Sequence, residues 1–141
     1  MDLTGGDNTR YVDVHAYGSN VYVAGRMVKA MLKKRIPIVG ARVLILGLAF
    51  KENCPDVRNT RVIDVVHGLR DYGIGVDVYD PWVDPQDARA AHDLEIIAAP
   101  QHGHYDGILL AVSHTVFTET GAAGLRAFGR PEHVFFDLKS V

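Results

Sequence analysis

The sequence predicts an α/β protein built on a doubly wound, mostly parallel, Rossmann-like sheet of five strands. Short apolar runs such as residues 43–48 and 107–112 have the length and composition of strands that are buried on both faces. Segments with a helical apolar period lie between such runs, and glycine, proline and polar residues separate them. Strands that alternate with helices indicate βαβ units, and therefore parallel strands.

An amphipathic helix is predicted over residues 17–35, ahead of any strand. Its apolar residues fall on one stripe, its cations face away, and Pro37 and Gly40 end the pattern. The stripe consists of Val21, Ala24, Val28 and Met31. Because no strand precedes it, we interpret residues 17–38 as the last part of a long connecting helix. Residues 1–16 show little periodicity and contain paired glycines, which predicts a poorly ordered lead-in.

Residues 42–79 have the pattern strand, loop, helix, strand. The polar stretch KENCPDVRNT, residues 51–60, is interrupted by proline and is predicted to be a loop. The next apolar residues recur at the spacing of one helix face, at Val62, Val65, Val66 and Leu69. An alternating run at Val76 and Val78 then predicts the second strand. In such units anions bind between the carboxyl end of the strand and the start of the helix, so this loop is the first candidate site.

The second half of the chain is predicted to complete the sheet. Strands are expected at residues 94–98, 107–112 and 134–138, and helices at residues 85–91 and within residues 113–128. Gly121 and Gly124 disfavour a continuous last helix.

The composition bounds the class of partner. Apolar residues make up 48% and charged residues 23% of the 141 residues, which is ordinary for one globular domain. The net charge of −2 gives no basic surplus, so no nucleic-acid partner is predicted. The single cysteine, Cys54, excludes an internal disulfide framework and fits a reducing compartment. No apolar run approaches the roughly 20 residues that span a bilayer. We therefore expect no membrane partner and a cytoplasmic location.

The loop after the first strand lacks the glycine fingerprint of a dinucleotide site. The strand runs into GLAFKE, where Gly47 is the only glycine, whereas G-x-G-x-x-G lets a backbone approach a pyrophosphate. This argues against an ordinary NAD site within the domain. The loop does carry Lys51, Arg58, Asn59 and Thr60 at a helix start, and these side chains can bind phosphate by charge and hydrogen bonds.

A second interpretation gives the same loop a structural role. Lys51 and Arg58 would then be solvated charges paired with Glu52 and Asp56, and Asp56 or Thr60 would cap the following helix. Both interpretations stay open on the loop residues alone.

Cys54 and the histidines offer weaker candidates. A thiol near a helix start can have a lowered pKa, but no histidine is near Cys54 in sequence and Pro55 follows it, so no catalytic role is predicted. His102 and His104 lack the further ligands of a metal site, so no metal is predicted.

Several residues follow strands and share the edge of the loop. Ser113 and His114 follow the buried strand of residues 107–112, and Lys139 ends the last strand. Tyr79 and Trp82 are expected to pack against the sheet edge, with base stacking by Trp82 left open.

Four motifs, in order along the chain, carry a resemblance to a known family. GLAFKENCPDVRNTRVIDVV, VDVYDPWVD, AVSH and FDLKSV are similar to the C-terminal domain of the UDP-glucose/GDP-mannose dehydrogenase family. The ENCPD and DPW forms look most like bacterial UDP-N-acetylhexosamine (GlcNAc/GalNAc) 6-dehydrogenases of surface-polysaccharide synthesis. The resemblance covers residues 21–141.

The resemblance implies a larger parent enzyme. Members of the family have an N-terminal Rossmann domain for NAD, a central helix that mediates dimerisation, and a C-terminal domain that binds the UDP part of the substrate. They oxidise the C6 alcohol of a UDP-sugar to a carboxylate with two NAD and a cysteine from a GGxCFPKD motif. That motif is absent here, so this chain is expected to bind UDP-sugar, to contain no catalytic residue and to be inactive alone.

The resemblance also assigns residues to sites. Phe50 and Lys51 belong to the nucleotide-sugar site, with Lys51 facing the diphosphate or sugar, and Lys139 stands where a basic residue approaches the sugar nucleotide. Arg58 matches an arginine that reaches across the domain interface towards NAD. The UDP-sugar-binding domain would comprise residues 39–141.

Two alternatives come from other classes. The chain could be a non-catalytic interaction or regulatory module, with the stripe of its front helix exposed for a partner. It could also be a CoA- or nucleotide-binding domain of an unrelated doubly wound family, because fold does not fix function.

Overall fold

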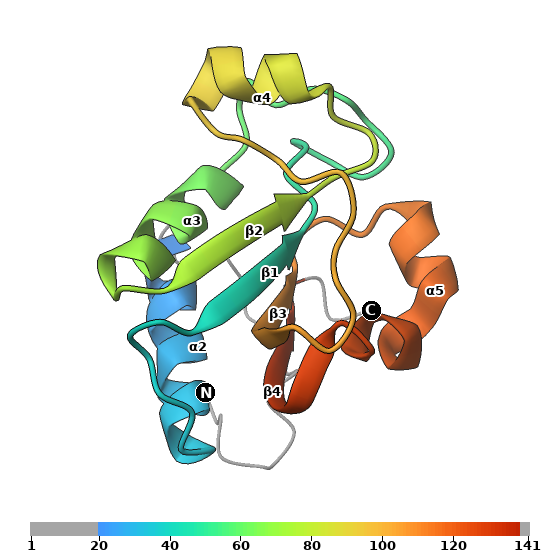
Figure 1. Cartoon of the computed structure of the whole chain (residues 1–141). Coiled ribbons are helices and arrows are strands. Elements are labelled where there is room, and N and C mark those ends of the chain that lie inside the picture. The colour runs from blue at the N-terminus through green and yellow to red at the C-terminus, as the bar shows by residue number, and fades with distance from the viewer. Residues whose placement is uncertain (1–19, 139–141) are drawn as a thin grey trace.

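The computed structural model describes residues 20–138, which fold as a parallel sheet with helices on both faces (Figure 1). The strands are β1 (Arg42–Leu46), β2 (Gly75–Tyr79), β3 (Tyr105–Leu110) and β4 (Gly129–Asp137). They lie in the order β2-β1-β3-β4, and each neighbouring pair is parallel. The predicted α/β class with a doubly wound, Rossmann-like sheet is therefore confirmed.

Helices cover both faces of the sheet and its carboxyl edge. They are α2 (Asn20–Lys33), α3 (Val62–Asp71), α4 (Pro85–His92) and α5 (Thr115–Arg126). In Figure 1, α2 and α3 lie on one face, α5 lies on the other, and α4 lies beyond the end of β2.

Alternate residues of β1 belong to two separate apolar clusters, one on each face of the sheet. Val43 and Ile45 belong to the cluster that includes residues of α2 and α3, whereas Leu44 and Leu46 belong to the cluster that includes residues of α5. All four side chains are fully buried. Burial on both faces explains why this strand is a continuous apolar run rather than an alternating one.

The prediction of a fifth strand at residues 94–98 is wrong. This segment is irregular and makes one backbone hydrogen bond to β2, from the N–H of Ile97 to the carbonyl of Val78 at 2.9 Å. Leu94 turns into the core, and Pro100, which has no N–H to offer a ladder, follows soon after. The sheet in the described part of the chain consequently has four strands.

Helix α2 is part of the core. Ala24, Val28 and Met31 of the predicted stripe are 0%, 7% and 0% exposed, and the helix packs against α3, β3 and β4. These residues are therefore not available to a partner, and the interaction-module alternative loses the exposed stripe on which it depends. The helix ends at Lys33, slightly earlier than predicted, and Arg35 adopts a left-handed φ of 61°.

The last two elements differ in detail from their predictions. Gly121 interrupts α5 with a φ of 78° and a ψ of 164°, as the glycine pattern suggested. Strand β4 begins at Gly129 rather than at residue 134, because Gly129 pairs with Tyr105 across a shift in register.

Residues 1–19 and 139–141 are not described, so the predicted lead-in and Lys139 lie outside the described residues. Within residues 20–138, no helix is both long enough and apolar enough to cross a bilayer.

Candidate functional site

Three segments meet at the carboxyl edge of the sheet. The loop after β1 runs from Gly47 to Thr60, the turn after β2 begins at Asp80, and the segment after β3 ends at His114. Parallel strands place their carboxyl ends at one edge, which is where doubly wound proteins bind ligands. The KENCPDVRNT loop therefore lies where the sequence predicts it.

Asp80 connects the three segments through its buried carboxylate. Oδ2 accepts hydrogen bonds from the backbone N–H groups of Leu48 and Ala49, at 2.7 and 2.9 Å, and from Nε2 of His114 at 2.9 Å. Oδ1 accepts the N–H of Trp82 at 2.8 Å. Burial raises the pKa of this carboxyl group, but the four hydrogen bonds together lower it more, so the pKa lies below its ordinary value. Asp80 is therefore an anion held by fixed donors.

His114 is fully buried and contacts two of the segments. Its Nδ1 accepts a hydrogen bond from the backbone N–H of Asn53 at 2.8 Å, and its Nε2 faces Asp80. A backbone N–H can only donate, so Nδ1 is the acceptor and Nε2 carries the proton of the neutral ring. The ring stacks on Trp82, with centroids 6.1 Å apart and an interplanar angle of 29°.

Phe50 and Lys51 lie on the loop between these attachment points. Both side chains are exposed, that of Phe50 at 54%. The N–H of Phe50 donates to the carbonyl of Asp56 at 2.7 Å, which closes this part of the loop. Among the described residues no carboxylate pairs with the Lys51 ammonium, so the predicted pairing with Glu52 is wrong. The Lys51 ammonium thus faces solvent as a single positive charge.

Arg58 makes the ion pair that the structural interpretation expects. Its Nε and Nη2 donate to Oδ1 and Oδ2 of Asp56, each at 3.1 Å. The side-chain hydrogen bonds between them are the main cause that lowers the pKa of Asp56 and raises that of Arg58. The Arg58 side chain remains 81% exposed. Thr60, rather than Asp56, supports the helix start, because its Oγ1 accepts the N–H of Val62 at 3.1 Å.

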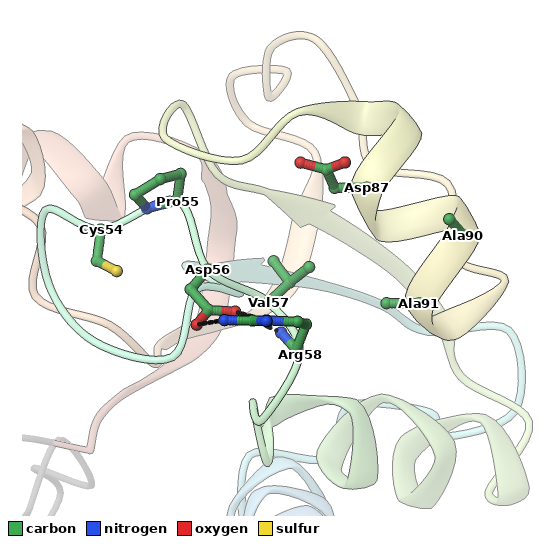
Figure 2. Close-up of a pocket in the computed structure, with 8 residues that line it drawn as sticks. All are labelled: Cys54, Pro55, Asp56, Val57, Arg58, Asp87, Ala90 and Ala91. Atoms are coloured by element: carbon green, nitrogen blue, oxygen red, sulfur yellow. Dashed lines mark hydrogen bonds and ion pairs between the residues drawn. The ribbon is translucent and has the colours of Figure 1, made fainter.

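An open hollow of about 560 Å³ lies between this loop and α4 (Figure 2). It is lined by Cys54, Pro55, Asp56, Val57, Arg58, Asp87, Ala90 and Ala91. Two carboxylates outnumber its one cation, which already pairs with Asp56. The hollow therefore offers no spare positive charge to a phosphate, and Lys51 is not part of its lining.

The remaining candidates take packing positions. The ring of His102 packs on Phe128 with centroids 5.0 Å apart, and that of His104 meets Tyr105 edge-on at 4.9 Å. No group of three or more His, Cys, Asp or Glu side chains within residues 20–138 is placed to hold a metal ion. Cys54 is a free, half-buried thiol.

The family model of the UDP-glucose/GDP-mannose dehydrogenase family, UDP binding domain, matches residues 44–141. The chain belongs to this family. It is 53% identical over 122 residues to a UDP-N-acetyl-D-glucosamine 6-dehydrogenase of Pseudomonas aeruginosa, covering 86% of this chain and 29% of the relative. A Salmonella typhi enzyme of the same name is 48% identical over 120 residues, covering 85% of this chain and 28% of its own length. The chain thus spans less than a third of these relatives.

Solved structures share the fold of this chain. A UDP-D-ManNAc dehydrogenase from Pyrococcus horikoshii matches with a TM-score of 0.63 at 22% identity, covering 83% of this chain and 26% of its own. At this identity the match shows the fold alone. A UDP-glucose dehydrogenase from Pyrobaculum islandicum matches with a TM-score of 0.55 at 29% identity, covering 68% of this chain and 23% of its own.

The structure places three of the predicted site residues on one loop. Phe50 and Lys51 lie on one loop, and Arg58 lies near the other end of it. Lys139 is not described, but the chain reaches the same edge just before it, because the N–H of Leu138 donates to the carbonyl of Leu110 at 3.1 Å.

Sequence reasoning missed Asp80. It singled out His114 by its position after a buried strand, yet the partner of His114 lies 34 residues away in the DPW turn. The available signal is that Asp80 directly follows β2 and His114 lies a few residues after β3, because the carboxyl ends of parallel strands share one edge.

Proposed function

We propose that this chain is the UDP-binding part of an NAD-dependent UDP-sugar 6-dehydrogenase, and that it binds the substrate without oxidising it. The observation that carries this proposal is the exposed Lys51 ammonium on a loop fixed at the carboxyl edge of the sheet. A lysine there supplies a point charge for a diphosphate. The names of the two relatives, both UDP-N-acetyl-D-glucosamine 6-dehydrogenases, support a UDP-sugar as the ligand.

Three residues form the proposed substrate site. Lys51 contacts the diphosphate or the sugar, Phe50 presents its exposed ring beside it, and Lys139 adds a second cation after β4. Their role is to orient the sugar nucleotide, so that C6 is held against groups from the rest of the parent enzyme.

Arg58 is proposed to face NAD in the parent enzyme. Its guanidinium is mostly exposed and its Nη1 lies outside the pair with Asp56, so the group fits contact with a ligand held by another domain. NAD supplies the hydride acceptor, two per turnover, as the C6 alcohol becomes a carboxylate. The dinucleotide itself is held mainly outside this chain, because GLAFKE after β1 lacks the glycine fingerprint.

The proposal includes a setting for the chain. Residues 39–141 form the UDP-sugar-binding domain, residues 17–38 contain the C-terminal part of the central connecting helix, which ends at Lys33, and the parent enzyme is a homodimer. We place the parent in the cytoplasm and in surface-polysaccharide biosynthesis.

Calorimetric titration with UDP tests the proposed site through two cations of the same loop. Lys51→Ala is expected to weaken UDP binding at least about tenfold, because a charge-assisted contact to the diphosphate is lost. Arg58→Ala is the matched control, and should leave the affinity for UDP within about twofold of wild type. Equal losses in both variants would indicate unspecific attraction of an anion, and would overturn the assignment of Lys51.

Two further measurements separate this function from other candidates. Addition of a UDP-sugar and NAD to this chain is expected to give no NADH absorbance, and robust turnover would contradict a binding role. CoA is expected not to displace UDP, whereas displacement would favour a domain of the unrelated CoA-binding class.

A further inference from the structure

One buried pair fastens the Lys51 loop at both of its ends. At the near end, Oδ2 of Asp80 accepts the N–H groups of Leu48 and Ala49. At the far end, Nδ1 of His114 accepts the N–H of Asn53. Because His114 also donates to Asp80 from Nε2, the two attachment points are joined through a single hydrogen bond. Phe50, Lys51 and Glu52 lie between them, and all three are exposed.

The far attachment holds an unusual backbone conformation. Asn53 has a φ of 54°, in the left-handed region that residues other than glycine seldom adopt. Its side chain also bridges to the start of α5, donating to Oγ1 of Thr115 at 2.8 Å and accepting the Thr115 N–H at 3.0 Å. His114 and Thr115 together therefore hold the turn that directs the chain back after Lys51.

The imidazole that makes this attachment has little freedom to rotate. Its side chain has no exposed surface, and it packs against the rings of Trp82 and Phe117, with centroids at 6.1 and 5.6 Å. A flip of the ring would exchange its nitrogens and carbons and remove both hydrogen bonds. Among the described residues, Asp80 is the only charged side chain that forms a hydrogen bond with it.

We propose that His114 and Asp80 are positioning residues for the nucleotide-sugar site: they fix the loop of residues 48–53, so that Lys51 is held ready for the diphosphate. This inference rests on the proposed function. Neither residue contacts the ligand, and both act through the backbone of the loop. An anchored loop binds more tightly than a mobile one because less conformational entropy is lost on binding.

Two isosteric variants separate the two hydrogen bonds of His114. His114→Asn places a side-chain oxygen near the position of Nδ1, where it can accept the N–H of Asn53, but does not reach Asp80. His114→Gln places its amide nitrogen near the position of Nε2, where it can donate to Asp80, but leaves Asn53 without an acceptor. Thermal melting of both variants first establishes that each is folded.

UDP titration of these variants tests the role in positioning. We expect His114→Gln to weaken UDP binding about tenfold and His114→Asn to recover most of that loss, because only the latter keeps the bond to Asn53. A merely structural pair would lower the melting temperature of both variants and leave the affinity for UDP unchanged. Equal affinities in wild type and both variants would overturn the proposal.

A double-variant cycle tests whether the effect passes through Lys51. In the Lys51→Ala background, His114→Gln should cause little further loss of affinity, because the residue being positioned is gone. A full, additive tenfold loss would show that His114 acts on the site by another route and would contradict the proposal.

A measurement without ligand keeps this inference separate from the proposed function. The amide of Asn53 should be protected from hydrogen exchange in wild type and in His114→Asn, and should exchange faster in His114→Gln. The imidazole ¹⁵N shifts of wild type should show a proton on Nε2 and none on Nδ1. If this pattern is seen but UDP does not bind, the proposed function fails, whereas the attachment of the loop by His114 and Asp80 stands. A proton on Nδ1 would contradict the attachment itself, because Nδ1 could then not accept the N–H of Asn53.

Discussion

Nε2 of His114 lies 2.9 Å from Oδ2 of Asp80, and both side chains are fully buried. Asp80 follows β2, His114 follows β3, and each also binds backbone N–H groups of the loop after β1. The Asp80 carboxylate and the His114 imidazole therefore join all three segments of the carboxyl edge. The stability of this edge and its competence to bind a ligand depend on the same few hydrogen bonds.

Replacement of Asp80 by asparagine is expected to lower the free energy of unfolding at neutral pH by about 1–3 kcal/mol, because an amide cannot keep all four hydrogen bonds. The pKa of Asp80 is lowered in the folded state, so its stabilising effect is present above the unfolded pKa of about 3.9 and is lost as the pH falls through the folded value. Urea unfolding from about pH 5 to about pH 3 should show the gap between wild type and Asp80→Asn becoming smaller. A gap that widens in acid would contradict this account.

Tyr105→Phe tests the polar cluster at the opposite edge of the sheet. The hydroxyl group of Tyr105 donates to Asp77 at 2.7 Å, and Asp77 also pairs with Arg42. Loss of this hydrogen bond is expected to lower the free energy of unfolding by about 1 kcal/mol, whereas Tyr72→Phe, at an exposed position, should have no effect.

The raised pKa of Tyr105 predicts that the free energy of unfolding depends on pH in the alkaline range. Burial, followed by the hydrogen bond and the charge of Asp77, raises the pKa of Tyr105 to about 12. Its stabilising effect is fully present below the unfolded pKa of about 10 and is lost as the pH rises towards 12. Unfolding measured as the pH rises from about 10 towards 12 should show the stability of wild type falling relative to that of Tyr105→Phe. Parallel curves would show that the folded state does not perturb this hydroxyl group.

Gly47→Ala is expected to be strongly destabilising, by about 2–4 kcal/mol. Gly47 has a φ of 103°, and an added Cβ would lie 2.6 Å from Cβ and 2.7 Å from the backbone nitrogen of Val112. Gly103→Ala is the matched control, because Gly103 also has a positive φ, 63°, but open space around it. The control should cost about 1 kcal/mol in denaturant unfolding, from backbone strain alone. Equal costs would show that the contact with Val112 is relieved by a small shift.

Neighbouring residues of α2 test whether this helix belongs to the core. Met31→Ala is expected to lower the free energy of unfolding by about 2–5 kcal/mol, because the Met31 side chain is 0% exposed. The adjacent Leu32 is 58% exposed, so Leu32→Ala should change the stability by less than about 0.5 kcal/mol. Chemical unfolding of the two variants makes the comparison. If Leu32→Ala had the larger effect, α2 would bury a different face in solution.

The elements that the sequence predicts well are those whose pattern depends on burial. Strands β1 and β3 are apolar on both faces because helices cover both, and α3 shows the helical period of a single buried face. The segment of residues 94–98 misled the prediction because its apolar residues are also buried, but in an irregular chain beside β2. Apolar content reports burial, and it does not report whether backbone groups form a ladder.

The candidate site divides in the same way. The position of the loop follows from local order along the chain, and so does the pairing of Arg58 with Asp56, two residues apart. The pairing of Asp80 with His114 depends on which strands become neighbours in the sheet, and local patterns contain no such information. The unpaired state of Lys51 likewise depends on the folded structure, where no described carboxylate lies within ion-pair distance of its ammonium group.

The central claim is that a uridine diphosphate group binds at the loop of residues 48–53. Amide chemical-shift mapping during a titration with UDP tests it most directly. We predict that the shifts concentrate on this loop and on His114 and saturate at or below about 1 mM UDP, while amides at the opposite edge, such as that of Gly103, stay unchanged. No shift in the loop at millimolar UDP, or shifts centred on the opposite edge, would contradict the claim.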